Sequence, residues 1–469
     1  MKRLGIAFLI LMMVSSFGFA GGQKDAAPAS SGDVTTVRFV LKDLSPAEAI
    51  NQQYLRNVEA GFEVWSGKKI RLEAVQMPEG AYAEKLNLML LGGDIPDLIY
   101  FQGGDEVIAN QGLLVDLNKY VKGSKIMQEV LLDFNKDRMA NYPYLLWLAP
   151  PRARTTVIRE DWFEEAGGKV PETIDDYYNL FKKIKTNHPR AAVVTETGNT
   201  ERMDYTFNQA FGVTATWIKQ GSGYVYSKVS EAEKNKLAFY QKLYAEGILD
   251  NAYITTAWDG MEDKLYTGQI AGAFATAGIV LDIYENKLME NQGVGLVALP
   301  PAKGVGRGYA VSTAKETRGW AISATSRNPD LVFELLEFMA TDEGQIMDRF
   351  GVEGVHFTRT GGQIAKTDKA SEWWPKFHEV MVWEAPIPLM GPEAAKSWDF
   401  IAQYAVGDPD FPIPEEFSAT WDALENLYKE YSYKIISGEY PISRFDEFVS
   451  KWYQLGGDKI TAYAAERLK

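Results

Sequence analysis

Cysteine is absent from the 469 residues of the chain. Its absence excludes disulfides, cysteine nucleophiles, cysteine-ligated zinc and lipid attachment to an N-terminal cysteine. A chain of this length can do without disulfides because its hydrophobic cores are large enough. Histidine is nearly absent too, since only His188, His356 and His378 occur and they are scattered. We therefore expect no histidine-rich metal site and no cofactor.

Positive charge is in short supply, with 49 Lys and Arg against 63 Asp and Glu, a formal net charge of −14. An excess of negative charge opposes binding to nucleic acid and to anionic membranes, so we expect neither partner. P-loop, HExxH and GxSxG motifs are missing. Neighbouring carboxylates such as Asp175 and Asp176 point apart on a helix and are interpreted as solvated surface.

Long apolar runs are confined to the N-terminus. Two basic residues precede an apolar stretch over 4–14, and Gly18 and Ala20 are small residues at the −3 and −1 positions of a cleavage site. The pattern predicts a signal peptide over residues 1–20 that directs export. The apolar stretch is shorter than the roughly 20 residues that a membrane span needs. The alternative is an uncleaved tether.

Residues 21–33 are small and polar and predict a flexible linker. The part that follows is too long for one hydrophobic core, so we expect two domains. Strand-like runs alternate with helical periodicity from residue 37 to residue 110 and again from residue 155 onwards. This alternation predicts an α/β fold with two lobes and mostly parallel sheets. A ligand would then bind between the lobes, near the carboxyl ends of the strands.

Tryptophan is abundant, with twelve residues. An indole ring can stack on the apolar C–H face of a sugar, although packing in a core is the alternative for each single tryptophan. Several of them lie outside clear helix-core patterns: Trp147, Trp217, Trp258, Trp320, Trp383 and Trp398. We expect some of this set to line a sugar-binding cleft.

Three segments together resemble family 1 extracellular solute-binding proteins of the LipO-like, carbohydrate-binding type. The first covers residues 82–101 with 112–121, the second 158–184, and the third 319–345 with 350–358. The resemblance implies a two-lobed periplasmic-binding-protein fold (type II) whose discontinuous lobes close by hinge bending. Residues 34–150 and 278–320 are expected in the N-lobe, and residues 151–277 and 321–469 in the C-lobe.

The resemblance also implies a function. It predicts a non-catalytic component of an ABC importer that captures a carbohydrate, expected to be an oligosaccharide, and delivers it to the transmembrane permease subunits. We expect a monomer that is free in the periplasm, because no cysteine can carry a lipid. One alternative is an exported glycoside hydrolase, which needs two carboxylates across a glycosidic bond. A structural or adhesive surface protein is a second alternative, disfavoured because no repeat is visible.

Candidate ligand-binding residues follow from position, in loops after the first and third strands, near the first lobe crossing and at exposed aromatic positions. They are Lys42, Asp43, Gln102, Asp105, Arg152, Trp217, Trp258, Glu353, His356, Trp383 and Trp398. Trp217, just before a Gly-Ser-Gly turn, is the first choice for stacking. Glu353 and His356 are equally compatible with a structural role. If Arg152 and Arg154 face the cleft, the ligand carries a carboxylate, since Arg pairs with it bidentately.

A calcium site is not expected. Many longer family members carry an acidic calcium loop after the helix that matches residues 174–184. Here residues 186–192 read TNHPRAA and offer no carboxylate, the ligand that calcium prefers.

Overall fold

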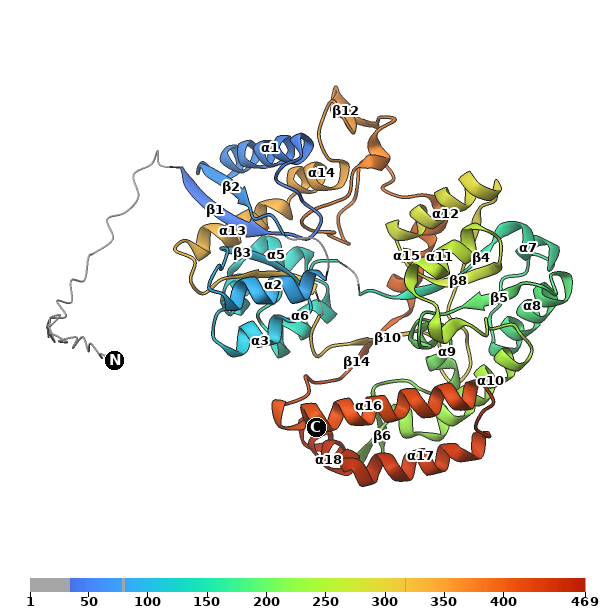
Figure 1. Ribbon diagram of the computed structural model, residues 1–469. Helices are drawn as coiled ribbons and strands as arrows, with labels where there is room; N and C mark the ends of the chain where they lie inside the picture. Colours follow the sequence, from blue (N-terminus) through green and yellow to red (C-terminus); the bar gives the residue numbers. More distant parts are fainter. Residues whose placement is uncertain (1–33, 78–80, 150, 317, 469) are drawn as a thin grey trace, which may run out of the picture.

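The computed structural model describes residues 34–77, 81–149, 151–316 and 318–468. The predicted signal peptide and linker lie outside the described residues. The chain forms two lobes, each built on a four-stranded sheet, with a wide separation between their helices (Figure 1). Within the described ranges, none of the helices combines the length and the apolar character that crossing a bilayer requires.

The N-lobe is built on a sheet of order β11-β3-β1-β2. Its strands are β1 (Thr35–Val40), β2 (Ile70–Ala74), β3 (Leu98–Gln102) and β11 (Arg318–Ile322). The first three are parallel, as βαβ spacing predicts, and β11 runs antiparallel to β3. The helices of this lobe are α1 (Ala49–Ser66), α2 (Tyr82–Leu91), α3 (Asp105–Asn110), α4 (Asn118–Gly123), α5 (Lys125–Val130), α6 (Asp133–Asn141), α13 (Pro329–Met339) and α14 (Asp342–Phe350).

The C-lobe sheet has the order β5-β8-β4-β9. Its strands are β4 (Arg154–Arg159), β5 (Ala192–Thr195), β8 (Ile270–Thr276) and β9 (Leu296–Leu299). Every residue of β8 is buried, as its unbroken apolar run predicts for a central strand. Because β4 is antiparallel to both β8 and β9, this sheet is mixed, and the prediction of mostly parallel sheets is wrong for this lobe.

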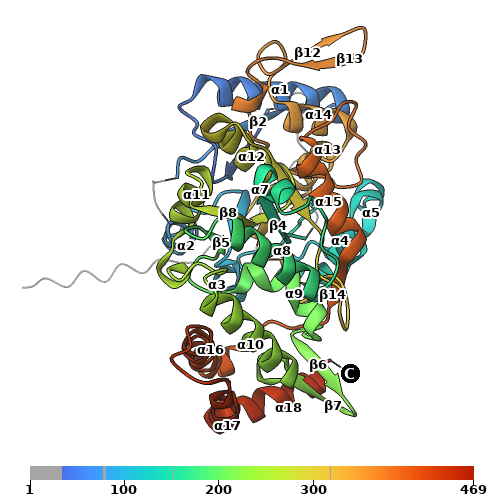
Figure 2. The same ribbon diagram turned by 90° about the vertical axis from the view of Figure 1, so that its right-hand side faces the viewer.

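Helices cover the C-lobe sheet, and at one end of the lobe α16 packs against α10 while α17 packs against α16 (Figure 2). They are α7 (Glu160–Glu165), α8 (Ile174–Asn187), α9 (Glu201–Phe211), α10 (Glu231–Ala245), α11 (Trp258–Tyr266), α12 (Ile279–Gln292), α15 (Pro392–Tyr404), α16 (Glu415–Ile436), α17 (Phe445–Trp452) and α18 (Asp458–Arg467). The start of α8 follows from its sequence. The Thr173 side chain accepts a hydrogen bond from Asp176 N–H, and the Asp176 carboxylate accepts one from Thr173 N–H, which forms a capping box.

Three two-stranded ribbons have too little periodicity to be predicted. They are β6 (Trp217–Gln220) with β7 (Gly223–Tyr226), β10 (Tyr309–Ser312) with β14 (Ala405–Asp408), and β12 (Phe357–Thr360) with β13 (Gln363–Lys366). The β10–β14 ribbon lies between the lobes (Figure 1). Arg138 of α6 donates to the Ser312 carbonyl at 2.8 Å and pairs with Glu316 at 2.6 Å, which ties this ribbon to the N-lobe.

The lobe boundaries differ from those expected. Residues 278–312 carry α12 and β9, and β9 pairs with β4 of the C-lobe rather than joining the N-lobe. Residues 318–380 carry β11, α13 and α14, and their apolar side chains pack into the N-lobe core. The physical reason is that strand pairing over long sequence separations decides which sheet a strand joins. The residue pattern of a short apolar strand such as β9 or β11 is compatible with either sheet, so the pattern does not predict which sheet the strand joins.

Candidate functional site

A cavity of about 330 Å³ lies between the lobes. The N-lobe contributes the ends of β1 and β3, the start of β11 and a loop over residues 374–379, here called the cleft loop. The C-lobe contributes the end of β8, the start of α12 and one face of α15, and the first crossing between the lobes forms part of the wall. The cavity therefore lies where loops at strand ends of both sheets meet, the usual place for a ligand in such folds.

Three indole rings line the cavity, those of Trp147, Trp374 and Trp398, and each is half-buried. Trp147 packs near the Tyr100 ring at 6.4 Å between centroids. The Trp374 ring packs against no other aromatic ring in the described part of the chain. Gly278, with φ of +83°, allows the Trp398 indole to lie close, because a Cβ there would be 2.3 Å from Nε1. Partly exposed indoles of this kind offer flat apolar faces to a ligand.

The polar lining is unbalanced in charge. Among the described residues that line the cavity, four are cationic, Lys42, Arg152, Arg318 and Lys376, and two are carboxylates, Asp43 and Glu379. Glu379 is already close to the Arg349 guanidinium, at 3.7 Å. Burial, together with repulsion from Arg318 and Arg154, lowers the pKa of Arg152 to about 10. The cavity thus carries positive charge in a chain whose net charge is −14.

Two further arginines extend this positive region into the C-lobe. Arg154, at the start of β4, donates to the Thr276 hydroxyl at the end of β8. Arg202, in the first turn of α9, lies over the Trp258 ring at 4.1 Å. Burial lowers the pKa of both guanidinium groups, and Arg202 lowers that of Arg154 further by repulsion. Among the described residues, no carboxylate lies within 4.0 Å of any guanidinium in this set: Arg152, Arg154, Arg202 and Arg318.

The cleft loop is held by one buried carboxylate. Asp348 of α14 accepts hydrogen bonds from the backbone N–H groups of Lys376, Phe377 and His378 at 2.8–3.1 Å, and from the Tyr54 hydroxyl at 2.7 Å. Burial raises the pKa of Asp348, and these hydrogen bonds work against that rise. Asp348 therefore positions Trp374 and Lys376 without reaching the cavity itself.

Five of the residues predicted from the sequence come together in this cavity: Lys42, Asp43, Gln102, Arg152 and Trp398. Their role in ligand binding stays a prediction. Other cavity-lining residues were not singled out from the sequence, chiefly Trp374, Arg318, Lys376 and Glu379. A sequence signal for Trp374 exists, since the run Trp373-Trp374-Pro375-Lys376 has no helical periodicity and contains a proline, which favours a loop.

Trp217 does not reach the cavity. Its side chain is only 3% exposed and stacks on Phe411 at 5.7 Å, beside Tyr226 at 5.2 Å. The Gly-Ser-Gly sequence is the turn of the β6–β7 hairpin, and the C-terminal part of the chain covers that hairpin. The local sequence does not show this burial, because Phe411, on which the Trp217 ring stacks, lies almost 200 residues further along the chain.

Asp105 and His356 are also buried elsewhere. The Asp105 carboxylate is fully buried and pairs at 3.0 Å with Lys315, next to the second crossing between the lobes. His356 accepts a hydrogen bond from Val352 N–H on Nδ1 and packs near the Trp373 ring. These contacts give it a structural role, the alternative to ligand binding that its sequence position allows.

The remaining three candidates lie outside the cavity lining. Trp258 lies under the Arg202 guanidinium. Glu353 is exposed on the N-lobe, 4.0 Å from Arg359. Trp383 donates its indole N–H to Asp342 at the start of α14, at 3.1 Å. Each position follows a loop or a helix end, so spacing alone could not separate it from a cleft position.

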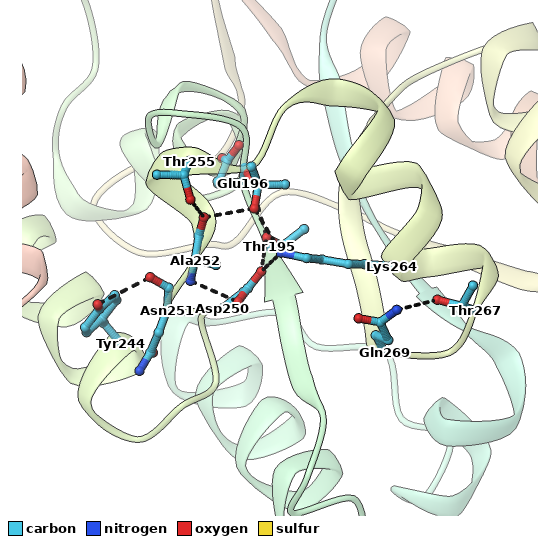
Figure 3. A network of polar contacts seen from close by, with 11 residues as sticks. Thr195, Glu196, Tyr244, Asp250, Asn251, Ala252, Thr255, Lys264, Thr267 and Gln269 are labelled. Carbon is cyan, nitrogen blue, oxygen red and sulfur yellow. Dashed lines mark hydrogen bonds and ion pairs between the residues drawn. The ribbon is translucent and has the colours of Figure 1, made fainter.

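A polar network follows β5 in the C-lobe (Figure 3). Asp250 accepts from the Thr195 hydroxyl at 2.9 Å and from the Lys264 ammonium at 2.5 Å. Next to it, the Glu196 carboxyl is fully buried and accepts from Met203 N–H on one oxygen, while its other oxygen has no partner among the described residues. Burial raises the pKa of Glu196 from 4.5 to about 8.

Glu196 is expected to make the protein less stable as pH rises. Because its pKa is higher in the folded than in the unfolded chain, stability falls between about pH 4.5 and pH 8. Glu196→Gln, which resembles the protonated carboxyl, should match the parent at pH 5 and exceed it at pH 8 by about 2 kcal/mol or more. Urea unfolding at both pH values measures this, with the exposed Glu201→Gln as control. Parallel pH dependence in parent and variant would contradict the assignment.

Comparison with known proteins places these features in a family. The family model described as bacterial extracellular solute-binding protein matches residues 49–346. Lipoprotein LipO of Bacillus subtilis (strain 168) is 22% identical over 93% of each chain. The polygalacturonan/rhamnogalacturonan-binding protein YtcQ of the same organism is 20% identical over 85% of each chain.

A solved structure shares the fold. The alginate-binding protein AlgQ2, crystallised without calcium ion, superposes with a TM-score of 0.63 at 18% identity, covering 92% of this chain and 97% of its own. The family match covers most of the chain, and it agrees with the observed fold of two lobes and a cavity between them. The chain belongs to the bacterial extracellular solute-binding proteins, with the two-lobed fold of periplasmic binding proteins.

Proposed function

We propose that this protein is the solute-binding component of an ABC importer and that it captures an oligosaccharide in the interlobe cavity. The observation that carries the proposal is the trio of half-buried indoles, Trp147, Trp374 and Trp398, lining a cavity shared by both lobes. Apolar sugar faces can stack on these rings, while Lys42, Gln102 and the other polar side chains bond the hydroxyl groups. Two of the proteins given above, YtcQ and AlgQ2, are named as polysaccharide-binding proteins, which supports the same cargo class.

Ligand capture would couple to lobe movement. The cavity walls come from both lobes, so a sugar that bridges them favours the closed arrangement. The β10–β14 ribbon and the first crossing connect the lobes and would accommodate the bending. The permease would recognise the closed form of a single copy of the chain.

Catalysis is not part of the proposal. A glycoside hydrolase needs two carboxylates about 5–10 Å apart on opposite sides of a glycosidic bond. The two carboxylates at this cavity, Asp43 and Glu379, both belong to the N-lobe wall, and Glu379 lies beside Arg349. This arrangement favours binding over bond cleavage.

The relative LipO is named a lipoprotein, yet this chain contains no cysteine to which a lipid could be attached. We propose that the protein is exported by its N-terminal segment and acts free in the periplasm.

A saccharide screen tests the proposed function. We expect at least one neutral or acidic oligosaccharide to raise the melting temperature, because ligand that binds only the native state stabilises it. At a ligand concentration of 100 times Kd, the gain in the free energy of unfolding is about 2.7 kcal/mol. Chromatography of the same mixtures should show the sugar intact. Steady release of shorter products would contradict the binding role, and so would a panel without any stabilising saccharide.

A further inference from the structure

We propose that the cargo is an oligosaccharide carrying carboxylates, as uronate residues do, and that Arg152 and Arg318 bind one of these carboxylates in the cavity. The inference rests on the proposed function, since it names the substrate class of the same site. Its experiment separates a failure of the charge assignment from a failure of saccharide binding.

The two arginines at the cavity lack a counter-charge. Arg152 and Arg318 line the cavity and are half-buried, and in the described part of the chain neither has a carboxylate within 4.0 Å. Two buried arginines elsewhere in the protein do have one: Arg138 has Glu316 at 2.6 Å and Arg159 has Asp161 at 2.7 Å. Partly desolvated guanidinium groups without a carboxylate beside them are unfavourable, so a ligand that supplies the anion gains affinity.

The guanidinium groups also repel one another. Arg318 and Arg154 both lower the pKa of Arg152, and Arg202 lowers that of Arg154. The fold therefore gathers like charges around the cavity, although the chain as a whole is strongly acidic. An anion placed between Arg152 and Arg318 relieves this repulsion, and each guanidinium can donate two parallel N–H bonds to a carboxylate.

The cavity lining also restricts the kind of anion. The indole rings beside the arginines favour a ligand with an apolar C–H face, such as a sugar ring, and an anionic group carried on that ring would reach the arginines. Asp43 and Glu379 also face the cavity, and their charges oppose a dianion such as a phosphate ester. A singly charged carboxylate on each sugar fits both conditions, whereas a sulfated sugar is the competing ligand that the test must exclude.

Titration calorimetry can test the charge without changing the carbon skeleton. The probes are the trisaccharides of galacturonate, mannuronate and guluronate, each compared with its fully methyl-esterified form, together with maltotriose and a sulfated trisaccharide. We expect at least one uronate trisaccharide to bind 10- to 100-fold more tightly than its methyl ester. Raising the salt concentration from 0.05 M to 0.5 M should weaken binding of the uronate and leave binding of its methyl ester almost unchanged.

Variants connect the effect to the two arginines. Arg152→Gln and Arg318→Gln should each weaken uronate binding about 10- to 100-fold and should narrow the difference between acid and ester. Arg318→Lys should recover only part of the affinity, because an ammonium lacks the guanidinium fork. Arg56→Gln, at an exposed position of α1, is the matched control and should bind like the parent. The melting temperature of each free variant shows whether it is folded.

The outcomes are distinct. Tighter binding of methyl esters, of maltotriose or of the sulfated trisaccharide than of every uronate overturns the carboxylate inference and leaves the proposed function intact. Equal acid-to-ester ratios in the parent and in the two glutamine variants overturn the assignment to Arg152 and Arg318. Absence of binding by every saccharide overturns the proposed function itself.

Discussion

Replacing Asp348 with alanine is expected to lower the free energy of unfolding by about 3–5 kcal/mol and to weaken saccharide binding at least 10-fold. Asp348 accepts from three consecutive backbone N–H groups of the cleft loop and from the Tyr54 hydroxyl, and its side chain is fully buried. Alanine leaves these donors buried without an acceptor, and each loss costs about 1–3 kcal/mol before relaxation. The cleft loop would then no longer hold Trp374 and Lys376 in place.

Urea unfolding gives the stability, and calorimetry with a bound saccharide gives the affinity. The control is Asp368→Ala, at an exposed position of the same lobe, which should leave both quantities within about 0.5 kcal/mol of the parent. Asp348→Asn keeps one acceptor oxygen, so its stability and its affinity should lie between those of the parent and those of Asp348→Ala. An alanine variant as stable as the parent would show that the cleft loop does not depend on this carboxylate.

Removing two of the cavity indoles should abolish most of the binding. Trp374→Ala and Trp398→Ala are each expected to cost about 2 kcal/mol of binding free energy or more, because aromatic anchors in partly closed sites carry a large share of it. Together they should weaken binding more than 100-fold. The losses should be close to additive, since the two rings lie on opposite lobes and touch different neighbours.

Two other tryptophans serve as controls for this double variant. Trp65→Ala removes an indole that is 41% exposed on α1 and lies outside the cavity, so its binding should not change. Trp217→Ala should lower stability but leave the affinity of the folded fraction intact, because that indole is in the C-lobe core. Binding lost in Trp217→Ala and retained in the Trp374 and Trp398 variants would reverse the assignment of the site.

The local elements of the fold can be predicted from the sequence. Residues 81–91 have helical spacing and form α2, and the apolar run over 270–276 is β8. Such patterns depend on neighbours in the chain, so they survive folding. The assignment of β9 and β11 to their sheets depends on pairing with β4 and β3, which are far away in the sequence, and periodicity does not encode it.

The site can be predicted only where it follows strand ends. Lys42 and Gln102 line the cavity, as the sequence predicts, because loops after β1 and β3 meet at one edge of a parallel sheet, and their role in binding stays a prediction. Asp105 shares that loop region, yet its side chain turns inward to Lys315. Trp374 and Arg318 belong to residues 318–380, which return to the N-lobe. That return depends on the long-range pairing of β11 with β3.

Lobe closure on a saccharide tests the central claim most directly. Because the chain has no cysteine, Arg56→Cys on the N-lobe and Arg190→Cys on the C-lobe place two spin labels without competing sites. Pulsed electron paramagnetic resonance should show a shift to shorter interlabel distances when a saccharide that binds by calorimetry is added at saturation. The shift should be absent when Trp374→Ala and Trp398→Ala are also present. Unchanged distances with a bound saccharide would contradict capture between the lobes.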